Sequence, residues 1–134
     1  FYSGALLDHD AVLATMAYVD LNPIRARITA YIEGCRDTSI EARLSHSTDA
    51  VATYLAPVIA GTEHPQTIPI GLDQYASLLR AVSAKASAEE PTRIAIWRQR
   101  LESIKHRQRA YGALTTLIAW LAERGLAPRE RPFA

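Results

Sequence analysis

The chain has 134 residues, of which 49% are hydrophobic and 22% are charged, and its formal net charge is +1. This composition is typical of a globular protein with one domain or two small ones. No apolar run approaches the roughly 20 residues of a membrane span and no signal peptide opens the chain, so we expect a cytoplasmic protein without a membrane partner. The single cysteine, Cys35, excludes an intramolecular disulfide and a zinc site made of four cysteines.

The charge is unevenly distributed along the chain. Residues 1–71 hold eight acidic and four basic residues, whereas residues 72–134 hold six acidic and eleven basic residues. This asymmetry indicates two regions with different functions, and the second region is the better candidate for contact with a polyanion.

The first predicted helix begins with Asp8 or Asp10 as its N-cap and carries Tyr18 and Asn22 on successive turns. Residues four apart on a helix lie on nearly the same side, so these two polar side chains face one region. Pro23 prevents ordinary continuation of the helix. A purely structural interpretation remains open at this point, with Tyr18 as a half-buried core residue whose hydroxyl finds a partner and Asn22 as the N-cap of a short second turn.

Residues 18–26, YVDLNPIRA, resemble the tyrosine motif of the single-tyrosine HUH transposases, especially the REP-associated tyrosine transposases. The flanking residues 5–8 and 37–40 also look like those of long family members. The resemblance implies that Tyr18 is the nucleophile, which attacks a DNA phosphate and becomes linked to the 5′ end. It also implies that Asn22 completes a Mg²⁺ or Mn²⁺ site with two histidines from a separate strand. Such hard ions prefer oxygen ligands, and they neutralise the charge of the phosphate.

Two features depart from the family pattern. Arg27 stands where the family often has glycine, and a non-glycine residue would cost about 1 kcal/mol if that position needs a left-handed backbone. No two of His9, His46, His64 and His106 are separated by a single residue, so the His-hydrophobic-His element is absent. We therefore expect the C-terminal part of a longer transposase, or a gene remnant, without the sheet of the family's α+β catalytic domain. This part alone is expected not to cleave DNA.

The middle of the chain predicts short helices followed by a linker. Within residues 31–56, Thr38 and Glu41 form a capping-box pattern that opens one helix, and a second helix begins at residue 48 or 49. Residues 57–71 are rich in proline and glycine and predict a linker.

Residues 72–134 predict three helices and a frayed C-terminal tail. Each helix has one narrow apolar stripe, so we expect a small three-helix bundle that acts as an accessory domain. The three stripes are Leu72, Tyr75, Leu79 and Val82; Ile94, Trp97, Leu101 and Ile104; and Leu114, Leu117, Ile118 and Leu121. The predicted fold is therefore mostly α. It is divided into the nucleophile-bearing end of a catalytic domain (residues 1–30), a short-helix extension (31–56), a linker (57–71) and the accessory domain (72–134).

A basic segment on the second of these helices is the other candidate for DNA contact. With Arg25 from the motif, the candidate DNA-binding residues are Arg93, Arg98, Arg100, Lys105, Arg107 and Arg109. The segment is equally well explained as the solvated face of an amphipathic helix, with Trp97 in the core rather than stacked on a base.

The leading functional interpretation is the C-terminal part of a mobile-element transposase, active in DNA transposition and recombination. It would cleave and rejoin single-stranded or hairpin transposon ends through a 5′-phosphotyrosine intermediate, and a homodimer is compatible with this role. Whether the chain is itself an enzyme stays open, because the histidine ligands are missing. The alternatives are a non-catalytic helical DNA-binding or regulatory module and a helical protein-interaction domain.

Overall fold

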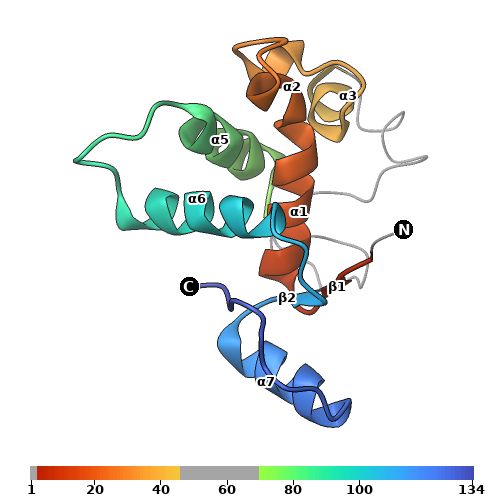
Figure 1. Cartoon of the computed structure of the whole chain (residues 1–134). Helices are drawn as coiled ribbons and strands as arrows, with labels where there is room; N and C mark the ends of the chain where they lie inside the picture. The colour runs from red at the N-terminus through yellow and green to blue at the C-terminus, as the bar shows by residue number, and fades with distance from the viewer. Residues whose placement is uncertain (1–2, 46–69) are drawn as a thin grey trace. The chain divides into compact units, whose positions relative to one another are not determined.

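The computed structural model describes residues 3–45 and 70–134, which are mostly helical, as predicted (Figure 1). The elements of these residues are β1 (Ala5–Leu6), α1 (His9–Asp20), α2 (Asn22–Arg25), the 3₁₀ helix η1 (Ile32–Gly34), α3 (Ser39–Ser45), α5 (Leu72–Ser83), α6 (Thr92–Ile104), β2 (Ala110–Tyr111) and α7 (Leu114–Glu123). Within the described ranges, no helix combines the length and the apolar character needed to cross a membrane. The second predicted short helix, most of the predicted linker, His46 and His64 fall outside the described residues.

The chain divides into two compact units, and α1 contributes to both. The first unit comprises residues 1–16 and 89–134, and the second comprises residues 17–88. This division differs from the predicted grouping of three helices in one bundle, because α5 belongs to the second unit while α6 and α7 belong to the first. The apolar stripe of α5 places the buried Tyr75 against the end of α1, which a periodic pattern alone does not indicate.

The first unit joins two distant parts of the sequence through a short parallel β pair. Ala5 lies opposite Ala110 and Leu6 lies opposite Tyr111 in this pair. The N–H of Leu7 donates a hydrogen bond to the carbonyl of Tyr111 at 3.0 Å. The sequence did not predict these strands, because two residues are too few to display the alternating pattern of a strand.

Asp8 is the N-cap of α1, as predicted, and it also binds the start of α7. Its Oδ1 accepts a hydrogen bond from the N–H of Ala11 at 2.9 Å. Its Oδ2 accepts one from the N–H of Ala113 at 2.8 Å, and the hydroxyl of Thr116 donates to the same oxygen at 3.1 Å. One carboxylate therefore satisfies backbone donors at two helix N-termini, where negative charge is favourable.

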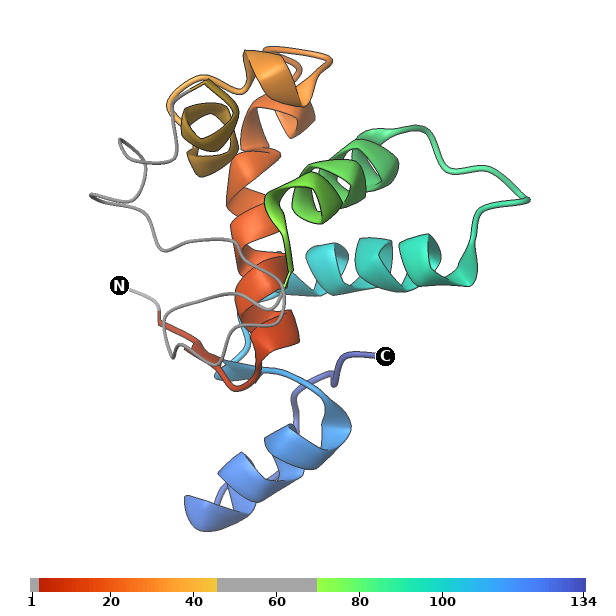
Figure 2. The ribbon, with the colours of Figure 1, turned by 180° about the vertical axis from the view of Figure 1, so that it is seen from behind.

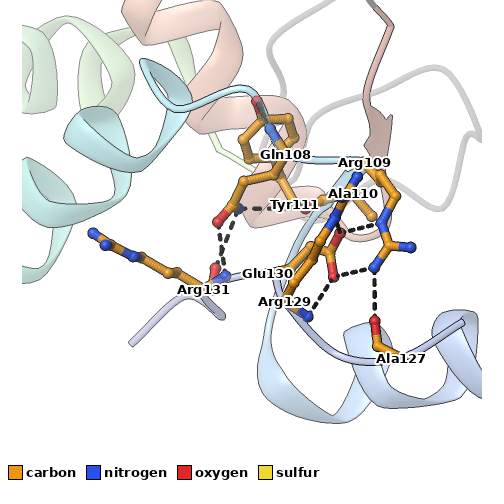
Figure 3. Close-up of polar contacts among 8 residues, drawn as sticks. All are labelled: Gln108, Arg109, Ala110, Tyr111, Ala127, Arg129, Glu130 and Arg131. Atoms are coloured by element: carbon orange, nitrogen blue, oxygen red, sulfur yellow. Dashed lines mark hydrogen bonds and ion pairs between the residues drawn. The ribbon is translucent and has the colours of Figure 1, made fainter.

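The predicted frayed tail is wrong, because side chains of the segment around β2 bind the last residues (Figure 3). Gln108 Oε1 accepts from the N–H of Arg131 at 2.7 Å, and Gln108 Nε2 donates to the carbonyl of the same residue at 3.3 Å. The Arg109 guanidinium pairs with Glu130, and this hydrogen bond lowers the pKa of the Glu130 carboxyl to about 2. Phe133 is buried, and its N–H donates to the carbonyl of Gly112, the residue that follows β2, at 2.8 Å. The bonds of Gln108 and Arg109 come from side chains and leave no periodic trace in the sequence.

In the second unit, η1 and α3 lie close to the end of α1. Figure 2 shows α2, in orange, and α3, in dark gold, at the same end of that helix. The predicted helix opened by Thr38 is confirmed as α3, because the N–H of Glu41 donates to Thr38 Oγ1 at 3.4 Å. Ile32, Ile40 and Leu79 are fully buried and contribute the apolar core of this unit.

Candidate functional site

The candidate site is centred on the junction between α1 and α2, where a single residue interrupts the helices. Leu21 stands between them, with its N–H bonded to the carbonyl of Ala17 and its carbonyl accepting from the N–H of Arg25, both at 3.0 Å. The N-cap of α2 is Leu21 and makes no side-chain capping bond, so the interpretation of Asn22 as the N-cap is wrong. Asn22 is instead the first residue of α2, followed by Pro23, whose missing N–H is tolerated in a first turn.

Three polar side chains at this junction, those of Tyr18, Asn22 and Arg25, form no hydrogen bond or ion pair within the described residues. Tyr18 is half-buried, and the Arg25 guanidinium lies 4.1 Å from the centroid of its ring. Asn22 is exposed. Within residues 3–45 and 70–134, neither the Tyr18 hydroxyl nor the Asn22 carboxamide forms a hydrogen bond. The alternative in which the Tyr18 hydroxyl has a core partner therefore finds no such partner in the described part of the chain.

Asp20 has the opposite role, because its carboxylate points into the protein. It is 1% exposed, and two successive helix positions rotate it by about 200° from Tyr18. The hydroxyl of Ser39 donates to both carboxylate oxygens at 2.9 and 2.8 Å, and the N–H of Ile40 donates to Oδ1 at 3.1 Å. The hydroxyl of Tyr75 donates to Oδ2 at 2.6 Å. The end of α1 is thereby joined to α3 and α5.

Burial and the charge of Asp20 shift the pKa values of two neighbouring side chains, Tyr75 and Arg43. Burial raises the pKa of the Tyr75 phenol, and the nearby Asp20 charge raises it further, so Tyr75 stays a hydrogen-bond donor at neutral pH. Burial lowers the pKa of the Arg43 guanidinium, while the charge of Asp20 opposes that shift. This network was not predicted from the sequence, although an aspartate among apolar residues, two positions after Tyr18, indicates a buried polar group that needs partners.

The turn that follows α2 has a left-handed backbone at Arg27, the position where the transposases that the motif resembles often have glycine. Arg27 has φ of 58°. The N–H of Ile28 donates to the carbonyl of Pro23 at 2.8 Å, and the N–H of Arg27 donates to the carbonyl of Ile24 at 3.0 Å. These two bonds form a Schellman motif, which usually has glycine at the left-handed position.

Replacement of Arg27 by glycine is expected to raise the free energy of unfolding by about 1 kcal/mol, because the strain of a β-carbon at positive φ is relieved. Urea denaturation monitored by circular dichroism measures this change. The matched control is Arg27→Ala, which removes the same charge but keeps the β-carbon, and it should leave the stability close to that of the parent chain. An equal gain for both variants would show that the side chain, not the backbone, is responsible.

The described residues do not form a divalent-metal site by themselves. Asn22 offers one neutral oxygen, but the Asp20 carboxylate is committed to the interior. Within the described ranges, no group of three or more histidine, cysteine, aspartate or glutamate side chains is arranged to hold a metal ion. The fit to Mg²⁺ or Mn²⁺ is therefore limited to one ligand, and the others would have to come from elsewhere.

Most cations of the basic segment have acidic partners within the first unit. The ion pairs are Arg98 with Glu90 at 2.7 Å, Arg100 with Asp10 at 2.9 Å, Lys105 with Glu102 at 2.5 Å and Arg109 with Glu130 at 2.5 Å. Arg93 and Arg107 are exposed. Trp97 is buried and lies 4.6 Å from the Arg100 guanidinium, which confirms it as a core residue. The segment is thus less available to a polyanion than its composition suggests.

Comparisons of the chain with models of protein families, with curated proteins and with solved structures find no match. The functional interpretation therefore rests on residues 18–26 and on the geometry of the junction that they form.

Proposed function

We propose that this chain is the nucleophile-bearing part of a single-tyrosine HUH-type transposase that acts in the cytoplasm on single-stranded or hairpin transposon ends. The observation that carries the proposal is the YVDLNPIRA motif at a helix junction where Tyr18 and Asn22 follow each other by one turn. Neither polar group is used by the described fold. The left-handed backbone at Arg27, where the family often has glycine, supports the same assignment.

In the proposed reaction, Tyr18 Oη attacks the phosphorus of a DNA phosphodiester. A bond forms between Oη and phosphorus while the bond between phosphorus and the 3′ oxygen of the preceding nucleotide breaks. The phenol loses its proton to a base, the leaving 3′ oxygen gains one, and the 5′ end remains on the tyrosine. Because one phosphodiester replaces another, the strand can later be rejoined without ATP.

The chain alone is expected to be inactive. The family's chemistry uses a divalent ion, and the described residues supply only the Asn22 oxygen toward it. We therefore propose that two histidines outside this sequence complete the site. The reading frame that encodes these residues should contain a His-hydrophobic-His motif within a sheet-forming domain.

Replacement of Tyr18 by phenylalanine is expected to abolish covalent attachment of DNA, because the attacking oxygen is removed while the ring stays. The product of the whole reading frame, incubated with hairpin single-stranded DNA and Mg²⁺, should give an adduct on a denaturing gel, and the Tyr18→Phe variant should give none. The matched control is Tyr31→Phe, since Tyr31 is exposed and outside the motif, and this variant should keep the adduct. An adduct that survives in Tyr18→Phe would overturn the assignment.

The alternative of a non-catalytic DNA-binding module has less support. It would rely on the basic segment around α6, and most of the cations there are already paired with acidic side chains.

A further inference from the structure

Arg25 differs from Arg98, Arg100, Lys105 and Arg109 of the basic segment, because it has no acidic partner among the residues that the structure describes. Its side chain is exposed, and within the described residues its guanidinium forms neither an ion pair nor a hydrogen bond. Its one described contact is the face of the Tyr18 ring. Seven positions along a nearly continuous helix return to almost the same face, which explains why these two side chains meet.

The contact with the Tyr18 ring leaves the N–H groups of the guanidinium available. The guanidinium carbon lies 4.1 Å from the ring centroid, as in a cation–π contact, and none of its N–H groups donates a hydrogen bond within the described residues. These N–H groups match two oxygens of a phosphate, which arginine binds in a bidentate manner. Because the ring also limits the rotamers of Arg25, less conformational entropy is lost when a phosphate binds.

We propose that Arg25 holds the non-bridging oxygens of a single-stranded DNA phosphodiester beside Tyr18, as the phosphate-positioning residue of this site. This inference rests on the proposed function. It gives Arg25, which the sequence had offered as one of seven candidate DNA-binding residues, a specific role in holding a phosphate beside Tyr18. Tyr18, Asn22 and Arg25 then form one phosphate-facing surface, with the attacking oxygen, an amide and a cation on successive turns.

The proposal is tested by measuring binding of the 134-residue chain to a fluorescent hairpin oligonucleotide of single-stranded DNA. Fluorescence anisotropy at salt concentrations from about 50 to 200 mM gives both the affinity and its salt dependence. For Arg25→Gln we expect an affinity about fivefold lower near 0.1 M salt. The slope of the logarithm of the binding constant against the logarithm of the salt concentration should be smaller in magnitude by about 0.7, because one phosphate contact to a single strand is lost. Arg25→Lys should keep the slope, since the charge remains, but should bind more weakly than the parent because the planar fork is lost.

Two controls separate this role from general surface charge and from folding. Arg36 is exposed in the same unit, and no described contact joins it to Tyr18, so Arg36→Gln should change the slope less than Arg25→Gln. Thermal unfolding followed by circular dichroism should be the same for the variants and the parent, because both arginines are exposed.

Several outcomes would overturn the inference. They are an unchanged slope in Arg25→Gln, an equal loss in Arg36→Gln, or the absence of salt-dependent binding by the parent chain. The proposed function is judged separately by the covalent adduct of the whole reading frame. A normal adduct together with any of these outcomes would leave Tyr18 as the nucleophile and remove Arg25 from its role.

Discussion

Replacement of Asp20 by alanine is expected to lower the free energy of unfolding by about 3–5 kcal/mol. The carboxylate is the acceptor for the hydroxyls of Ser39 and Tyr75 and for the N–H of Ile40, and all of these donors would be left without their acceptor inside the protein. Arg43, which is also buried, would lose the negative charge that offsets its desolvation. Both effects act in the same direction.

Urea denaturation of the 134-residue chain measures this loss. Asp20→Asn should be intermediate, because an amide oxygen keeps one acceptor without the charge. Asp73→Ala is the matched control, since Asp73 is exposed on α5 in the same unit, and it should change stability by less than about 1 kcal/mol. The double variant Asp20→Ala/Tyr75→Phe should lose less than the sum of the single losses, because the two side chains share one bond. A loss below about 1 kcal/mol for Asp20→Ala would contradict the network.

Replacement of Asp8 by alanine is expected to lower the free energy of unfolding by about 2–3 kcal/mol. Removal of one N-cap typically costs about 1 kcal/mol and up to about 2. Asp8 acts at two helix N-termini, because its oxygens accept from the N–H of Ala11 at the start of α1 and from that of Ala113 at the start of α7. The loss should therefore exceed that of an ordinary cap.

Asp8→Asn should lose no more than half as much stability as Asp8→Ala, since asparagine is also a good N-cap. The matched control is Asp10→Ala, which removes a carboxylate of the same helix whose partner is Arg100. Asp10 is half-exposed in that ion pair, so its loss should cost less than about 1 kcal/mol. Equal losses for Asp8→Ala and Asp10→Ala would show that the second cap contributes nothing.

The sequence predicted those parts of the fold that depend on neighbouring residues. Apolar periodicity located α5, α6 and α7, and capping residues located the starts of α1 at Asp8 and α3 at Thr38. Contacts between distant residues could not be predicted in this way. The β1–β2 pair is too short for a pattern, and the pairing of Arg109 with Glu130 joins residues 21 positions apart.

The same distinction applies to the candidate site. The motif gave Tyr18 and Asn22 on successive turns, and the family's glycine suggested the left-handed backbone found at Arg27. The burial of Asp20 depends on α3 and α5, which lie far along the chain, so local spacing could not reveal it. The stacking of Arg25 on Tyr18 follows from helical spacing only because the helices continue almost unbroken past Leu21.

The most direct test of Tyr18 as the nucleophile is to identify the residue that carries DNA after reaction. The product of the whole reading frame should be incubated with hairpin single-stranded DNA and Mg²⁺, digested with protease and nuclease, and examined by peptide mass spectrometry. We predict a nucleotide phosphate on the peptide that contains Tyr18, located on that side chain by fragmentation. A nucleotide on any other residue, or cleaved DNA without a covalent adduct, would contradict the assignment.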